Sequence, residues 1–91
     1  MSASAYTLTD IQTQLQQYFP NSQVEVTDES AAHAGHSGNP DGDAISHIRV
    51  MLRSAHFADV NKVTQHRAVH TALAPFYSLG LHAVVLDTAA A

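Results

Sequence analysis

The stretch that decides the fold reads His47-Ile48-Arg49-Val50-Met51-Leu52-Arg53. Its aliphatic residues Ile48, Val50 and Leu52 occupy every second position. Because successive side chains of a strand point to opposite faces, this alternation predicts a strand with one face in the core. The earlier segment Gln23-Val24-Glu25-Val26-Thr27-Asp28 alternates in the same way and is rich in β-branched residues, so we expect a second half-buried strand there.

A helix is predicted before these strands and another after them. Thr7 and Asp10 have the spacing of a capping box, apolar residues recur at helical spacing after them, and Pro20 follows, which predicts a helix over Leu8 to Phe19. Helical spacing resumes at Asn61. The expected apolar stripe of this helix is Val63, Val69, Ala72, Leu73 and Phe76, and the residues expected to face water are Lys62, Gln65 and Arg67.

Pro75 should kink or end the second helix, and Gly80 provides a stop before the next element. The apolar run Leu81-His82-Ala83-Val84-Val85-Leu86 then predicts a third strand covered on both faces. Between the first two strands, residues 29–44 are rich in Gly, Ser, Asn and Asp and predict a long loop. The order of elements indicates an α+β fold, with helices on one face of a three-stranded mixed sheet. We expect a single domain over residues 1–91, with residues 1–6 and 88–91 frayed.

Composition narrows the function classes. The chain has 91 residues, 45% of them hydrophobic and 13% charged, so it should fold as one domain. Its formal charge of −4 disfavours binding to a phosphate backbone. It has no cysteine, and therefore no thiolate ligand or nucleophile of its own. No apolar run reaches membrane-span length and no secretory signal is recognised, so we expect a cytoplasmic protein without membrane contact.

Seven histidines are the feature that needs an explanation. His33 and His36 lie three apart in the predicted loop, a spacing from which two imidazoles can reach one metal. The alternative is that both are solvated loop residues. His82 opens the predicted third strand, where it either binds a metal or donates a hydrogen bond to a backbone carbonyl. The residues alone leave these alternatives open.

The second helix presents a further candidate surface. Lys62, Gln65, His66 and Arg67 form a possible partner or nucleic-acid face, although the net charge favours a solvated or protein-docking face over a DNA-binding one. His66 and His70 have the spacing of the zinc-protease motif, but Arg67 stands where that motif has its glutamate. The Gly-x-Ser-x-Gly elbow of hydrolases is also missing. We therefore expect no catalytic residue and no enzymatic activity.

An ordered set of segments resembles the BolA-like family over about Leu8 to Leu86. The set is Val24 to Ser30, His33, Ser46-His47-Ile48-Arg49-Val50, Gln65-His66-Arg67-Ala68-Val69 and Leu81-His82-Ala83-Val84. The resemblance implies an α-β-β-α-α-β domain likened to class II KH folds, with a short extra helix near Phe57 to Val60. Where the family often has Arg-His-Arg, this chain has Gln65-His66-Arg67, which removes one cation from the helix face.

The resemblance also implies a function. Members of the family pair with monothiol glutaredoxins and share a [2Fe-2S] cluster that contains glutathione, to which they contribute histidine from the last strand and His or Cys from the loop. By position, His82 matches the strand ligand and His33 the loop ligand, with His36 as a nearby substitute. The implied protein is a monomer alone and a heterodimer with its partner, has no cofactor in the isolated chain, and transfers clusters or senses iron. The resemblance further implies a helix-turn-helix-like stretch, and the alternative function is a DNA-binding regulator that uses the face of this stretch.

Overall fold

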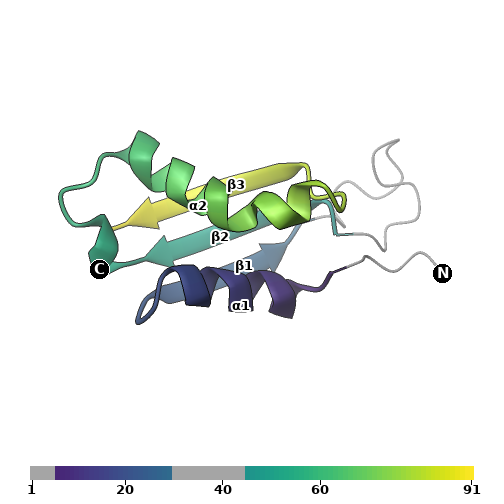
Figure 1. The fold of residues 1–91 in the computed structure, drawn as a ribbon, viewed down its shortest axis with the longest axis horizontal. Coiled ribbons are helices and arrows are strands. Elements are labelled where there is room, and N and C mark those ends of the chain that lie inside the picture. Colours follow the sequence, from purple (N-terminus) through teal and green to yellow (C-terminus); the bar gives the residue numbers. More distant parts are fainter. Residues whose placement is uncertain (1–5, 30–44) are drawn as a thin grey trace.

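The central strand of the sheet is β2 (His47–Arg53), which lies between two strands of opposite direction. The computed structural model describes residues 6–29 and 45–91. β1 (Gln23–Asp28) pairs antiparallel with β2, and β3 (Ala83–Ala89) pairs parallel with it on the other side (Figure 1). The predicted three-stranded mixed sheet is therefore confirmed.

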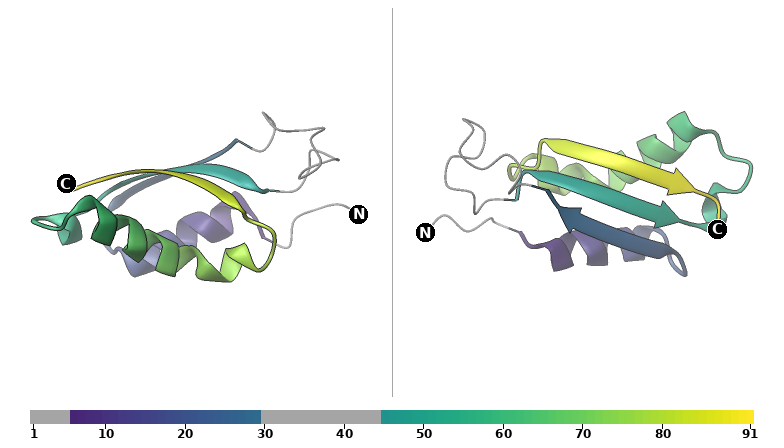
Figure 2. Two further views of the ribbon diagram at one scale, coloured as in Figure 1. Left: turned by 90° about the horizontal axis from the view of Figure 1, so that it is seen from above. Right: turned by 180° about the vertical axis from the view of Figure 1, so that it is seen from behind.

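Both α-helices cover the same face of this sheet, and the opposite face is left open (Figure 2). α1 (Leu8–Tyr18) begins with the predicted capping box, in which the Thr7 hydroxyl accepts from the Asp10 amide and the Asp10 carboxylate accepts from the Thr7 amide. α2 (Lys62–Tyr77) is capped by the Asn61 side chain, which accepts from the Thr64 amide at 2.8 Å. This arrangement confirms the predicted layer of helices on one face.

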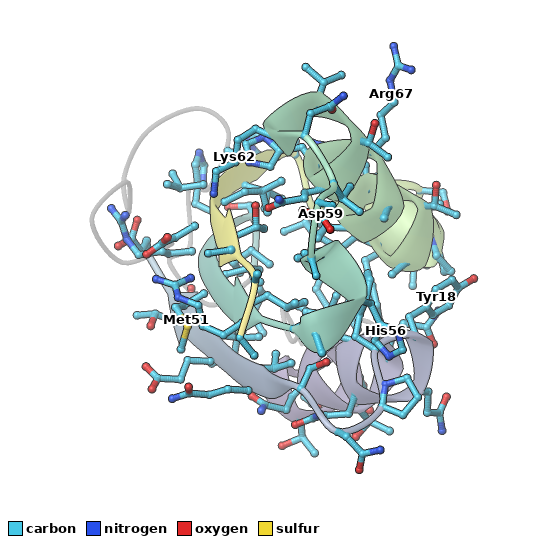
Figure 3. The ribbon with its side chains drawn as sticks, turned by 90° about the vertical axis from the view of Figure 1, so that its left-hand side faces the viewer. Tyr18, Met51, His56, Asp59, Lys62 and Arg67 are labelled. Carbon is cyan, nitrogen blue, oxygen red and sulfur yellow. The ribbon has the colours of Figure 1, made fainter. Side chains whose placement is uncertain are left out.

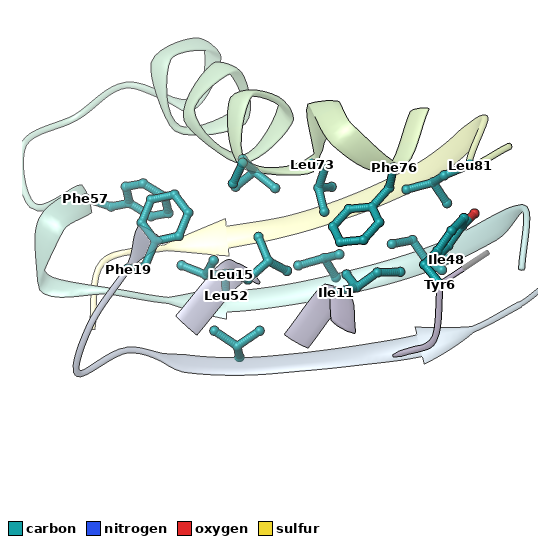
Figure 4. Close-up of a cluster of buried hydrophobic side chains, with 14 residues drawn as sticks. Tyr6, Ile11, Leu15, Phe19, Ile48, Leu52, Phe57, Leu73, Phe76 and Leu81 are labelled. Carbon is teal, nitrogen blue, oxygen red and sulfur yellow. The ribbon is translucent and has the colours of Figure 1, made fainter. Parts of the chain in front are cut away.

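The core lies between the helices and the sheet (Figure 4). The aliphatic residues that alternate along β2 all face it, as predicted from their spacing. At one end of the core, the rings of Phe19 and Phe57 meet edge to face with their centroids 5.3 Å apart. The buried hydrophobic residues are Tyr6, Ile11, Leu15, Phe19, Val24, Ile48, Val50, Leu52, Phe57, Val69, Ala72, Leu73, Phe76 and Leu81.

The apolar stripe predicted for α2 is correct except at its start. Val69, Ala72, Leu73 and Phe76 are buried, whereas Val63 is 61% exposed. The inward position of the first turn belongs to Gln65, because residues four, seven, eight and eleven places after it form the buried stripe. Val63 precedes Gln65 by two residues, about 200° around the helix, and therefore points to solvent.

The end of α2 decides between the two roles predicted for Pro75. Pro75 lies inside the helix, which continues to Tyr77, so the proline does not end it. Gly80 then adopts a φ of 119°, and the Leu81 amide donates to the Phe76 carbonyl at 3.1 Å. This is the left-handed glycine stop expected from the sequence, and it turns the chain back toward the sheet.

The third strand is shifted relative to its prediction. It runs over Ala83–Ala89 rather than Leu81 to Leu86, and the uncovered face of the sheet leaves Val85 46% exposed. Of the residues expected to fray, Tyr6 and Thr88 are buried and Ala89 belongs to β3, whereas Ala90 and Ala91 are exposed and lie beyond the strand. The Ser54 amide holds the strand end by donating to the Ala89 carbonyl at 3.1 Å. Residues 1–5 lie outside the described part of the chain.

The short extra helix implied by the resemblance is a 3₁₀ helix, η2, over Ala55–Phe57, and not a helix near Phe57 to Val60. The Ser54 hydroxyl caps it by accepting from the His56 amide at 3.1 Å. Within residues 6–29 and 45–91, no helix is both long and apolar enough to cross a membrane.

Candidate metal centre

His82 lies in the short connection between α2 and β3, one residue before the strand begins. Its neighbour Leu81 is buried in the core, and its own amide donates to the Ser46 carbonyl at 3.1 Å. The side chain of His82 is nevertheless exposed. The backbone of this histidine is therefore fixed by the sheet while its imidazole faces outward.

The His82 ring makes a contact that favours one of its two neutral tautomers. Its Nδ1 lies 3.2 Å from the Gly80 carbonyl oxygen. Because a carbonyl oxygen only accepts, this contact is a hydrogen bond in the tautomer that carries the proton on Nδ1, and that tautomer keeps the lone pair on Nε2. Histidine ligands of metals characteristically have one ring nitrogen held by a carbonyl or carboxylate in this way. The two alternatives left open by the sequence, a carbonyl hydrogen bond and a metal ligand, are therefore compatible in one residue.

A second histidine, which the sequence analysis did not single out as a ligand, lies against His82. His47 is the first residue of β2, and its ring centroid is 4.6 Å from that of His82, with an interplanar angle of 77°. His47 Nδ1 also lies 2.8 Å from the Ser46 hydroxyl. The parallel pairing that places His47 opposite Ala83 creates this contact, and only knowledge of the strand order would have revealed it.

The start of β2 is tied to the helix layer by Tyr6. The Tyr6 hydroxyl donates to the Ile45 carbonyl, and its ring packs against Phe76 at a centroid distance of 5.2 Å. Burial, with a smaller contribution from the charge of Asp28, raises the pKa of Tyr6, so the phenol stays protonated and remains a donor. The backbone that precedes Ser46 and His47 is thereby anchored to the core.

The other predicted ligands, His33 and His36, lie outside the residues that the structure describes. Within the described ranges, 6–29 and 45–91, no three His, Cys, Asp or Glu side chains form a group that could hold a metal ion. A metal bound through His82 therefore needs donors from the loop, from another molecule, or from both.

The predicted face of α2 is smaller than the sequence indicated. Gln65 was expected to face water, but it is only 5% exposed. Its amide nitrogen donates to the Val60 carbonyl at 2.6 Å, and its side-chain oxygen accepts from the Thr88 hydroxyl at 2.7 Å. Gln65 is thus a buried link between the start of α2 and the end of β3, because the polar side chain finds two partners there.

Replacement of Gln65 by alanine should lower the free energy of unfolding by about 1–3 kcal/mol, since the Val60 carbonyl and the Thr88 hydroxyl would lose their partner in a buried position. Gln17→Ala on the exposed side of α1 is the matched control and should change it by less than about 0.5 kcal/mol. Urea unfolding of both variants compares them. Equal losses would show that Gln65 contributes nothing beyond an ordinary surface glutamine.

The remaining residues of this face differ in their exposure and in whether their side chains are already hydrogen-bonded. Lys62 is exposed, but its ammonium group donates to the Thr88 carbonyl. His66 is half-buried. Arg67 is exposed and points away from the body of the protein (Figure 3). Arg67 is therefore the residue of this set that reaches furthest into solvent.

Comparisons with known proteins bear on this arrangement. A family model described as BolA-like protein matches residues 15–91. An uncharacterised protein from the region 5′ of cobS in Sinorhizobium sp. is 39% identical over 80 residues, which cover 88% of this chain and 86% of that protein. Among solved structures, BolA1 from Arabidopsis thaliana superposes with a TM-score of 0.79 at 27% identity, covering 97% of this chain and 95% of that one. The BolA domain of SufE1 from the same plant gives a TM-score of 0.79 at 26% identity, covering 94% and 95%.

Proposed function

Because this chain belongs to the BolA-like protein family, we propose that it is a non-enzymatic adaptor for an iron–sulfur cluster. It docks a monothiol glutaredoxin and contributes histidine to a [2Fe-2S] cluster that both proteins hold together with glutathione. The cluster is the cargo, delivered onward or used to report iron supply. The family resemblance suggests this partner, and the chemistry of His82 supports it.

The observation on which the proposal rests is the state of His82. Its ring is exposed, Nδ1 is engaged by the Gly80 carbonyl, and Nε2 keeps the lone pair that a metal requires. Imidazole is an accepted ligand of [2Fe-2S] centres, where it replaces thiolate on one iron. The residue therefore fits a cluster that is shared across an interface.

The rest of the ligand set fits a shared site as well. The chain has no cysteine, so every thiolate must come from the partner or from glutathione. His33, or His36 beside it, is the proposed second ligand from this chain, as the family resemblance implies. A glutaredoxin provides the cysteine that this sequence lacks.

The direct test is to titrate the protein into a cluster-loaded monothiol glutaredoxin and to follow visible absorption and circular dichroism. We expect a new dichroism spectrum that saturates at one protein per glutaredoxin, because a histidine ligand changes the electronic environment of one iron. Cluster-free glutaredoxin is the control and should give no visible signal. An unchanged spectrum with a folded protein would contradict the proposal.

The alternative function is a DNA-binding regulator, and few of the cationic side chains are available to contact DNA phosphates. Arg49 pairs with Glu29 at 3.1 Å and Arg53 with Asp87 at 3.1 Å. Lys62 is bonded to the Thr88 carbonyl, so Arg67 is the cation on the α2 face that can reach a phosphate without giving up another contact in the described structure. The small number of available cations therefore counts against the regulator.

The small number of free cations predicts how the affinity for DNA should depend on salt. Since each neutralised phosphate contributes about −0.9 to the slope of log affinity against log salt, we expect weak binding with a slope no steeper than about −2. The measurement is fluorescence anisotropy of a labelled duplex over a range of salt concentrations. A slope of about −5 or steeper would indicate several phosphate contacts and would favour the regulator.

A further inference from the structure

His47 and His82 lie ring against ring where β2 begins and β3 is about to begin, and from this contact we infer that His47 is a positioning residue for His82. It holds the His82 imidazole so that Nε2 faces outward before any metal arrives. The inference rests on the proposed function, because it concerns the ligand that the proposal assigns to this chain.

The two histidines differ in how firmly they are held. His47 belongs to the central strand of the sheet, is half-buried, and has its Nδ1 2.8 Å from the Ser46 hydroxyl. His82 is exposed and lies before its strand, and its Nδ1 makes the 3.2 Å hydrogen bond to the Gly80 carbonyl. A single exposed hydrogen bond of this length is weak and does not fix a side chain with two rotatable bonds. The more firmly held ring is therefore the one that can support the other.

The geometry of the contact suits that role. The centroids are 4.6 Å apart and the planes are inclined by 77°, which is the edge-to-face arrangement that aromatic rings prefer. The contact places the His47 ring against one side of the His82 ring and restricts its rotation there, while the Gly80 carbonyl retains Nδ1–H. Together the two contacts fix both the orientation and the tautomer of the ring.

Ser46 links the backbones of the two histidines. Its carbonyl accepts from the His82 amide at 3.1 Å and from the Ala83 amide at 3.1 Å, and its hydroxyl lies against the His47 ring. These hydrogen bonds hold the backbone of His82, in the connection before β3, against the residue that precedes β2. A ligand whose backbone is held in this way loses less conformational freedom when it binds.

The test uses His47→Ala, which removes the ring, and His47→Phe, which keeps an aromatic edge but no nitrogen. The first measurement is made on the protein without cluster or glutaredoxin, at about pH 8, where histidine side chains are ordinarily neutral. Side-chain ¹⁵N shifts and χ1 couplings of His82 should show one rotamer with Nδ1 protonated in the wild type and in His47→Phe. In His47→Ala they should show averaged rotamers and a mixture of tautomers.

The second measurement is the affinity for cluster-loaded glutaredoxin, followed by visible circular dichroism. His47→Ala should weaken it by about 10–100-fold, the loss usual for residues that orient a metal ligand, and His47→Phe should restore most of it. Urea unfolding verifies that both variants are folded.

Two results would overturn the inference. A single His82 rotamer and tautomer in His47→Ala would show that His47 does not position the ring. Equal loss of the cluster signal in both variants, with His82 still ordered, would make His47 a ligand instead. If the wild type gives no cluster signal, the proposed function fails, but the measurement on the free protein still decides whether His47 orders His82.

Discussion

Leu73→Ala is expected to lower the free energy of unfolding by about 2–5 kcal/mol, the range measured for buried leucines truncated to alanine. Leu73 is 0% exposed and lies on the face of α2 that packs against the sheet. It belongs to the cluster of buried hydrophobic residues that forms the core. Removing its branched end leaves a cavity that the rigid strands beneath cannot close. The loss therefore combines the transfer free energy of the lost methyl groups with that of the cavity.

The matched control is Val63→Ala, which truncates another aliphatic side chain of the same helix. Val63 is 61% exposed, so its removal should change the free energy of unfolding by less than about 0.5 kcal/mol. Urea unfolding gives both values, and an unchanged m-value shows that the two native states bury similar surface. Similar losses for the two variants would contradict the assignment of the inner face of α2.

The sheet and the first helix follow from local patterns in the sequence. β2 is half-buried, so its two faces meet different environments and its residues alternate accordingly. β1 is half-buried in the same way. The start of α1 is recognisable from the capping-box residues Thr7 and Asp10. A helix or strand with one face in the core and one in water can be predicted from its periodicity, because apolar residues occupy the buried positions and polar residues the exposed ones.

The predicted burial of α2 was wrong at two positions, where a polar residue is buried and an apolar residue is exposed. Gln65 was expected to face water because glutamine is polar, yet it is buried with two partners that lie in other elements. Val63 was expected to be buried because valine is apolar, yet its angular position on α2 directs it to solvent. The helical spacing of Val69, Ala72, Leu73 and Phe76 directs position 65 inward and position 63 outward, so the prediction erred by following the polarity of the two residues. What the sequence does not contain is the pair of buried partners, Val60 and Thr88, that Gln65 finds there.

The candidate site was predictable in part. His82 was identified from the sequence, although it lies before the strand and not within it. His47 was passed over as an ordinary strand residue, because its contact with His82 depends on the parallel pairing of β2 with β3. His33 and His36 remain predictions, since they lie outside the described residues.

His82→Ala is expected to abolish the spectral change seen when the protein is mixed with a cluster-loaded monothiol glutaredoxin. The variant lacks the Nε2 lone pair that the proposal places on one iron, and its backbone contacts with Ser46 do not involve the side chain. Since the ring is exposed, its loss should change the free energy of unfolding by less than about 0.5 kcal/mol. His33→Ala should only weaken the spectrum, because His36 can replace it as the loop ligand.

His56→Ala is the matched control for this substitution. His56 is also an exposed histidine, but it lies in η2 after the end of β2 (Figure 3), whereas His82 precedes Ala83, which pairs with the start of β2. Its loss changes the histidine content of the protein by the same amount and leaves the proposed site intact. This variant should bind cluster-loaded glutaredoxin like the wild type.

The most direct measurement is the visible circular dichroism of cluster-loaded monothiol glutaredoxin mixed with wild type, His82→Ala or His56→Ala, each verified as folded by urea unfolding. The account predicts the same new spectrum for wild type and His56→Ala, and the spectrum of glutaredoxin alone for His82→Ala. A folded His82→Ala protein that still gives the wild-type spectrum would contradict the account, because His82 would then be a structural residue and not a ligand of the shared cluster.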